Sequence, residues 1–250
     1  MDMAAYRASP TEQSRIADLL AMMLPPYFSA LDIGARDGYL SMRMADRYEL
    51  VTALDLTLPN ISHKKIEVVQ GNVTALTMPD NSFDIVVCAE VLEHIPAELL
   101  VRACKEIARV SKKWVLIGVP YRQDIRFGAT RCPSCGKTNP PWGHVNSFST
   151  DQLANLFSSL SINKVSYVGL TNEKTNFISH LLMEYAGHPF GTYAQDEHCT
   201  YCDSAISYSD QRTLSQRLAT RAAHILVSAQ KRITPKSPNW IHILFEKNEE

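Results

Sequence analysis

The chain has 250 residues, is 45% hydrophobic and carries a formal net charge of −1, so it can bury one sizeable core with an elaboration, or two small domains. It has no long run of one charge, which makes nucleic acid an unlikely partner. The first ten residues contain no apolar signal region, and no stretch approaches the roughly 18 uninterrupted apolar residues of a membrane-spanning helix. We therefore expect no membrane span and a cytoplasmic protein with reduced cysteines. The sequence does not indicate an oligomeric state.

Helical and strand patterns alternate through the first half of the chain. Ser9-Pro10-Thr11-Glu12 predicts a helix start, with a capping serine, a proline in the first turn and an acid at the third helical position. The elements predicted next are strands at 30–33, 50–54, 66–69, 83–88 and 114–119, and helices at 39–48 and 96–110. This alternation predicts an α/β fold with a doubly wound, mostly parallel, Rossmann-like sheet.

The second half is less regular. A capping box at Ser149 predicts a helix through about Leu160, followed by a strand at 165–168. Ser209 is expected to cap a long helix over 210–231, and a strand at 240–245 closes the chain. The connections at 121–147 and 170–209 are too long for simple turns, and such insertions usually carry function or a small separate fold.

The stretch LDIGARDGYL places glycines Gly34 and Gly38 directly after a predicted buried strand. In a doubly wound sheet, ligands bind beyond the carboxyl ends of the strands, and glycines allow close approach to the main chain. The spacing matches neither a dinucleotide fingerprint nor a phosphate-binding P-loop, which disfavours a nicotinamide-dependent oxidoreductase. Asp32 would repel a pyrophosphate, but it can accept hydrogen bonds from a cationic amino group or hold a water.

These residues resemble the class I S-adenosylmethionine-dependent methyltransferases. LDIGARDGYL is similar to the family's acid-x-Gly-x-Gly-x-Gly loop, with Arg36 in place of the middle glycine, which is tolerable if its backbone angles are ordinary. Asp55 matches the acid that accepts the ribose hydroxyls, and Gly71-Asn72-Val73 lies where a polar side chain approaches the adenine. FDIVVCAEVLEHI is similar to the fourth-strand motif of a branch that includes quinone and small-metabolite O-methyltransferases.

The resemblance implies a seven-stranded sheet with an antiparallel last strand and an S-adenosylmethionine site. The implied cofactor-binding residues are Asp32, Gly34, Ala35, Gly38, Asp55, Leu56, Asn72, Val73 and Glu90. Glu90 would contact the cofactor or order a water. The alternative interpretation makes the aspartates solvated strand ends, the glycines turn formers, and Glu90 an acid at a helix start.

Two CxxC pairs form a second signal: Cys132 with Cys135, and Cys199 with Cys202. Their thiolates predict a tetrahedral zinc site, and Gly136 lets the first turn curl toward the ion. We expect a structural zinc that joins two loops, because four thiolates leave no open coordination position. A redox pair or unlinked thiols are the alternatives. Cys88 and Cys104 lie in predicted core elements.

The predicted division is a core of residues 1–120, 148–170 and 239–250, with an inserted zinc-binding lid of 121–147 and 171–238. Family topology implies that both insertions leave the same edge of the sheet. We therefore expect the zinc to lie over the cofactor mouth and to shape the substrate pocket.

Methyl transfer to a hydroxyl requires a base to remove its proton. The candidates are His144 in WGHVNSF and His94 in EVLEHI; His144 could equally anchor a loop, and Glu93 is expected to be solvated or capping. The predicted function is O-methylation of a sugar, glycan or small metabolite; the alternative is a silent relative whose zinc insertion binds a partner. Aromatic residues could stack on the acceptor or fill the zinc domain. They are Tyr121, Phe127, Trp142, Phe148, Phe177, Tyr185, Phe190, Tyr193 and Tyr201.

Overall fold

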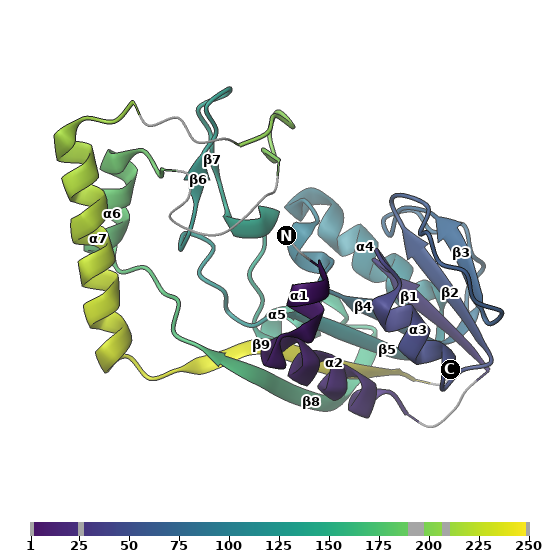
Figure 1. The fold of residues 1–250 in the computed structure, drawn as a ribbon. Helices are drawn as coiled ribbons and strands as arrows, with labels where there is room; N and C mark the ends of the chain where they lie inside the picture. The colour runs from purple at the N-terminus through teal and green to yellow at the C-terminus, as the bar shows by residue number, and fades with distance from the viewer. Residues whose placement is uncertain (1–2, 25–27, 190–197, 207–210, 249–250) are drawn as a thin grey trace. The chain divides into compact units, whose positions relative to one another are not determined.

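A computed structural model describes residues 3–24, 28–189, 198–206 and 211–248. The chain separates into two compact units, each of which is described by itself (Figure 1). The first, here the sheet unit, comprises Ala4–Tyr121, Phe148–Gly169 and Pro238–Glu250. The second, here the insertion unit, comprises Met1–Met3, Arg122–Ser147 and Leu170–Ser237.

A seven-stranded sheet forms the centre of the sheet unit, in the order β3-β2-β1-β4-β5-β9-β8. The first five strands pair in parallel, and β9 runs antiparallel to β5. This confirms the predicted Rossmann-like sheet with an antiparallel final strand. The strands are β1 (Ser29–Ile33), β2 (Leu50–Asp55), β3 (Ile66–Gln70), β4 (Phe83–Ala89), β5 (Ser111–Pro120), β8 (Leu160–Thr171) and β9 (Ser237–Lys247).

Helices cover both faces of this sheet, because its central strands are apolar on both sides. On β4, Val86 and Cys88 belong to one buried cluster, while Ile85 and Val87 belong to another. The first cluster includes residues of α4 and α5, and the second includes residues of α2 and α3. The helices are α1 (Met3–Ala8), α2 (Pro10–Met22), α3 (Tyr39–Ala45), α4 (Ala97–Val110) and α5 (Thr150–Leu156), with a 3₁₀ turn η1 (Leu92–His94).

Helix starts agree better with the sequence than helix ends. Ser9 caps α2 and accepts a hydrogen bond from the Glu12 N–H, and Ser149 forms the predicted capping box. The prediction that this second helix continues to about Leu160 is wrong, because α5 ends at Leu156 and Leu160 begins β8. Strand β8 is the last strand in the order of the sheet and is largely exposed, so its sequence lacks a clear apolar alternation.

The insertion unit contains a small hairpin and a pair of helices. The hairpin pairs β6 (Thr130–Arg131) with β7 (Thr138–Asn139), and the 3₁₀ turn η2 (Pro141–Gly143) follows. Helices α6 (Phe177–Ala186) and α7 (Leu214–Ile233) lie side by side (Figure 1). The sequence did not predict α6. Among the described residues, no helix combines the length and the apolar character needed to cross a membrane.

Helix α7 starts later than the sequence predicted. Ser209 and Asp210, the expected cap and first helical residue, lie outside the described residues. The observed cap is Thr213, which forms a capping box with Gln216, so the helix begins at Leu214.

Candidate cofactor site and metal centre

The turn after β1 requires glycine at two positions. Gly34 and Gly38 have φ angles of 80° and 75°, in the left-handed region that side chains disfavour. A Cβ atom on Gly34 would lie 2.3 Å from Cγ2 of Val91, and one on Gly38 would lie 2.4 Å from Cδ1 of Ile61. Both the backbone conformation and the packing therefore require glycine at these two positions. The Gly34 N–H donates to the carbonyl of Leu54 at 2.8 Å, which joins the turn to the end of β2.

Arg36, at the position of the family's middle glycine, does not have ordinary backbone angles. Its φ is 49°, so it adopts the left-handed conformation in spite of its side chain. Its backbone N–H donates to Oδ2 of Asp55 at 2.8 Å, and the N–H of Ala35 donates to the Leu54 carbonyl at 3.1 Å. Asp55, at the end of β2, thus holds the loop after β1 through a hydrogen bond to a charged acceptor.

Asp32 is a buried carboxylate at the end of β1, with only 2% of its surface exposed. The hydroxyl of Ser41, on α3, donates to its Oδ2 at 2.5 Å. Burial raises the pKa of Asp32 to about 6; the Ser41 hydrogen bond opposes this rise, and the nearby charge of Asp55 adds to it. Asp32 therefore offers hydrogen-bond-accepting oxygens beside the glycine turn.

The ends of β2 and β3 present a polar group beside apolar surface. The N–H of Gly71 donates to the Asp55 carbonyl at 2.8 Å, which joins the two strand ends. Oδ1 of Asn72 accepts hydrogen bonds from the backbone and hydroxyl of Thr74 at 2.9 and 2.8 Å. Val73 is buried, whereas Leu56 is 66% exposed. This edge can therefore offer an amide group and an apolar side chain to a planar ligand.

Glu90, which follows β4, belongs to a buried polar network and not to a helix start. Its φ is 58°, and its Oε2 accepts a hydrogen bond from the indole N–H of Trp240 at 3.2 Å. A guanidinium nitrogen of Arg15 lies 4.0 Å from its Oε1, and Arg15 is also paired with Glu12. Burial raises the pKa of Glu90, and Arg15 opposes this shift.

The expectation that Glu93 is solvated or capping is wrong. Its side chain is fully buried, and neither carboxyl oxygen has a hydrogen-bond partner among the described residues. Burial, followed by the nearby Glu90, raises the pKa of Glu93 well above its usual range. Glu93 cannot cap the following helix, because it lies in the separate 3₁₀ turn η1 and that helix starts only at Ala97.

The two candidate bases lie in different units. His94 lies in η1 of the sheet unit and is exposed. His144 lies in the insertion unit and is 7% exposed. Its Nδ1 is 2.7 Å from Oε1 of Gln123, and its ring centroid is 5.7 Å from that of Trp142. A partner on Nδ1 fixes the orientation of the ring, which suits a general base as well as a loop anchor.

The predicted acceptor-stacking aromatics do not share one environment. Phe148 belongs to the core of the sheet unit, and Tyr121 packs against Tyr167 with ring centroids 5.0 Å apart. Phe190 and Tyr193 lie outside the described residues. In the insertion unit, at least 57% of the surface of three aromatics is exposed: Phe177, Tyr185 and Tyr201.

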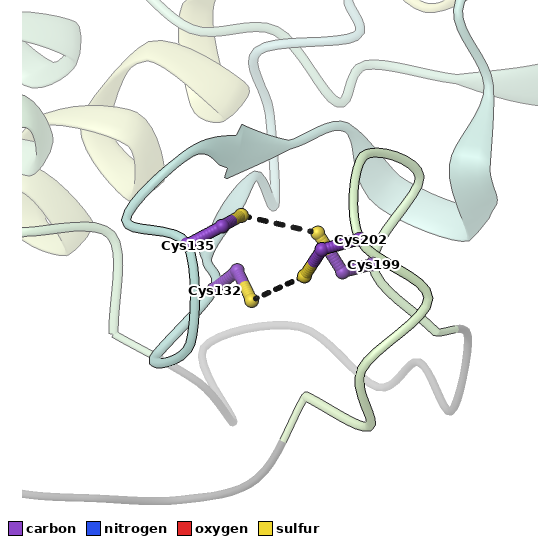
Figure 2. Close-up of side chains that lie close together, drawn as sticks. All are labelled: Cys132, Cys135, Cys199 and Cys202. Atoms are coloured by element: carbon purple, nitrogen blue, oxygen red, sulfur yellow. Dashed lines mark hydrogen bonds between the residues drawn. The ribbon is translucent and has the colours of Figure 1, made fainter.

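The four cysteines of the two CxxC pairs come together in the insertion unit (Figure 2). Their sulfur atoms all lie within 4.8 Å of one another. The Sγ atoms of Cys132 and Cys202 are 3.7 Å apart, and those of Cys135 and Cys199 are 3.6 Å apart. A disulfide requires about 2.05 Å, whereas a tetrahedral site with Zn–S bonds of about 2.3 Å has sulfurs about 3.8 Å apart. The cluster thus has the dimensions of a four-thiolate metal site.

Both cysteine turns have the same backbone design. In each, the residue after the second cysteine donates its N–H to the carbonyl of the first cysteine: Gly136 to Cys132 at 3.0 Å, and Asp203 to Cys199 at 2.9 Å. The φ angles of Gly136 and Asp203 are 73° and 57°. The sequence indicates only the first of these two residues, since Gly136 is a glycine and Asp203 is not, although aspartate is among the residues that tolerate this conformation.

Asn139, a buried residue of β7 that the sequence did not identify, fastens the second cysteine turn to the hairpin. Its Oδ1 accepts hydrogen bonds from the N–H and hydroxyl of Thr200 at 2.8 and 3.0 Å. Burial alone would raise the pKa of Cys199. Hydrogen bonds from the N–H groups of Tyr201 and Cys202 and from Asn139 outweigh burial and lower that pKa to about 6. Cys199 is therefore poised as a thiolate, the form that binds metals.

Comparison with known proteins gives consistent results. A family described as "Methyltransferase domain" matches residues 31–116. A ubiquinone biosynthesis O-methyltransferase of Idiomarina loihiensis is 31% identical over 94 residues, which are 33% of this chain and 39% of that protein. A Mycobacterium tuberculosis protein described as a probable S-adenosylmethionine-dependent methyltransferase is 29% identical over 147 residues, 56% of this chain and 50% of that protein. The chain thus aligns with half or less of either relative.

The fold has a solved counterpart. The N-methyltransferase NodS of Bradyrhizobium japonicum superposes with a TM-score of 0.56 at 13% identity, over 97% of this chain and 99% of that one. The family match runs from β1 into β5, so it includes the glycine turn, Asp55 and Glu90, and it ends before the four cysteines.

Proposed function

We propose that this chain, whose residues 31–116 match a methyltransferase-domain family, transfers a methyl group from S-adenosylmethionine to a hydroxyl acceptor. The observation that carries the proposal is the shared edge of β1, β2 and β3. There a glycine turn, the carboxylates of Asp32 and Asp55, and the amide of Asn72 lie at or just beyond adjacent strand ends. This is the edge at which doubly wound sheets bind ligands.

The donor set is suited to this cofactor. Two carboxylates beside the turn would repel a pyrophosphate, but they can accept hydrogen bonds from ribose hydroxyls and from a cationic amino group. In the proposal, Asp55 accepts from the ribose, and Leu56, Asn72 and Val73 hold the adenine. The turn of Gly34, Ala35 and Gly38 with Asp32 and Glu90 holds the methionine portion. S-adenosylmethionine, when bound, supplies an electrophilic methyl group on sulfur.

The acceptor is proposed to be a hydroxyl of a sugar, glycan or small metabolite. The similarity to a ubiquinone biosynthesis O-methyltransferase supports oxygen as the acceptor atom. His144 is the proposed base: its Nδ1 contact with Gln123 orients the ring, and an imidazole can accept a proton near neutral pH. His94, in the 3₁₀ turn η1 that follows β4, is the second candidate.

Zinc is the proposed occupant of the four-cysteine cluster, with a structural role. Sulfur separations of 3.6 and 3.7 Å and the matching backbone turns support a closed tetrahedral site. The ion would join the loop of Cys132 and Cys135 to the loop of Cys199 and Cys202. Zinc therefore organises the insertion unit, while the cofactor residues of the sheet unit do not depend on it.

Calorimetric titration with S-adenosylhomocysteine, the product form of the cofactor, tests the proposal. We expect saturable binding of one molecule per chain. Mass spectrometry of the purified protein under native conditions should also detect co-purified cofactor. Absence of binding at millimolar ligand would refute the proposal and favour the silent relative, whose zinc insertion binds a partner.

A further inference from the structure

A second group of metal-ligating side chains lies at the end of α6, in the insertion unit. His180, Glu184 and His188 each offer a ligand atom, and these atoms all lie within 4.8 Å of one another. None of the three belongs to the four-cysteine cluster. We propose that they bind a borderline divalent cation of the zinc class, as a site separate from the cysteines and independent of the methyltransferase assignment.

The helix and its end produce this convergence. Residues four apart lie on one face of a helix, which brings His180 and Glu184 together. The helix then ends at Gly187, whose φ is 79°, and His188 also has a positive φ of 44°. This left-handed end returns the chain toward the same face, so the His188 ring reaches Glu184.

One carboxylate oxygen lies near both rings. Oε1 of Glu184 is 2.8 Å from Nε2 of His188 and 4.0 Å from Nε2 of His180. The two ring centroids are 6.2 Å apart. Tetrahedral ligands at about 2.1 Å from zinc are about 3.4 Å from one another, so small side-chain rotations give all three atoms a common cation.

Arg131 orients the carboxylate. Its guanidinium lies 3.6 Å from Oε2 of Glu184, the oxygen other than the one near the histidines. The backbone N–H of Arg131 donates to the carbonyl of His188 at 2.9 Å, which ties the ligand turn to β6. Such outer contacts are what hold metal ligands in place.

A simple helix-end ion pair would need only Glu184 and His188. It does not account for the His180 ring beside the same carboxylate.

Two nitrogens and one oxygen form a donor set of a different class from four thiolates. Imidazole with carboxylate suits zinc, nickel, cobalt or iron, and three protein ligands leave a coordination position open for water or another ligand. His180 also borders a cavity of about 180 Å³, which α7 helps to line through Ala223 and His224. This cavity gives an ion a route to the site.

Equilibrium dialysis of tag-free protein that retains its cysteine-bound metal tests the proposal. We expect the wild-type protein to take up one further equivalent of zinc at micromolar free ion. The His180→Ala and Glu184→Ala variants should bind this ion about 100-fold more weakly or worse, since loss of an outer-shell partner alone costs up to about 100-fold. The matched control is His224→Ala, because His224 lines the same cavity but lies outside the cluster.

Cobalt identifies the ligands. Cobalt added to this protein should give the visible bands of nitrogen and oxygen ligands, without new thiolate charge-transfer absorption, and His180→Ala should abolish them. No further equivalent in the wild type, or equal uptake by wild type and His180→Ala, would overturn the proposal. If Glu184→Ala fails to fold, the result for His180→Ala decides between the outcomes. The His180 ring lies 4.0 Å from the Glu184 carboxylate, so its removal breaks no short contact to that residue.

Discussion

Replacement of Asp55 by alanine is the sharpest test of the cofactor edge. The carboxylate ends β2, and its Oδ2 accepts the N–H of Arg36 at 2.8 Å. Asp55→Ala removes the proposed acceptor for the ribose hydroxyls and the partner that holds a left-handed arginine. A hydrogen bond to a charged group contributes about 1.5–3 kcal/mol. Affinity for S-adenosylhomocysteine should therefore fall about 10- to 150-fold.

Asp55→Asn separates the charge of the side chain from its ability to accept a hydrogen bond. The asparagine carbonyl can still accept from Arg36, but the charge is lost, so the decrease in affinity should be smaller than for alanine. Calorimetry measures both variants. Glu49→Ala is the matched control, because Glu49 is an exposed acid directly before the opposite end of β2. Unchanged affinity in a folded Asp55→Ala protein, or an equal loss in Glu49→Ala, would refute the reasoning.

The remaining predictions concern the base, the zinc and a buried carboxylate. His144→Ala should lower turnover about 100-fold or more with cofactor affinity unchanged, and near-normal turnover would make His144 a loop anchor. Cys199→Ser/Cys202→Ser should lose zinc and acceptor methylation while cofactor binding persists; full zinc content by elemental analysis would contradict this. Asp32 has a folded pKa of about 6, above its ordinary value of about 3.9, so ionisation destabilises the folded state as pH rises from about 4 to 6. This ionisation lowers the free energy of unfolding by about 3 kcal/mol, and Asp32→Asn should remove that pH dependence. Identical pH profiles of wild type and variant in denaturant titrations would show that Asp32 does not have the raised pKa.

The central strands could be predicted because burial on both faces requires a continuous run of apolar residues, which is visible in the sequence. A strand covered on both faces must be apolar at successive positions, as Ile85 to Cys88 are, and few other elements have this pattern. Helix α6 escaped prediction for the opposite reason. Its apolar residues Phe177, Ile178 and Leu181 are all more than half exposed, so they mark no single buried face.

Some site residues could also be predicted from local patterns, whereas others depend on how the chain folds. The glycine turn and the cysteine pairs are local patterns whose residue types state their chemistry. The burial of Glu93, in contrast, depends on how a 3₁₀ turn packs. The positive φ of Asp203 could not be predicted either, because the residue is not a glycine. The spacing of His180, Glu184 and His188 is visible in the sequence, but only a helix that ends at Gly187 brings the three side chains together.

Thermal unfolding with alternative cofactors tests the central claim most directly. A ligand that binds only the folded protein raises its melting temperature. We predict that S-adenosylmethionine and S-adenosylhomocysteine raise it in a saturable way, that NADH does not, and that Asp55→Ala requires higher ligand concentrations for the same shift. A shift with NADH and none with either S-adenosyl compound would contradict the assignment of this sheet edge to S-adenosylmethionine.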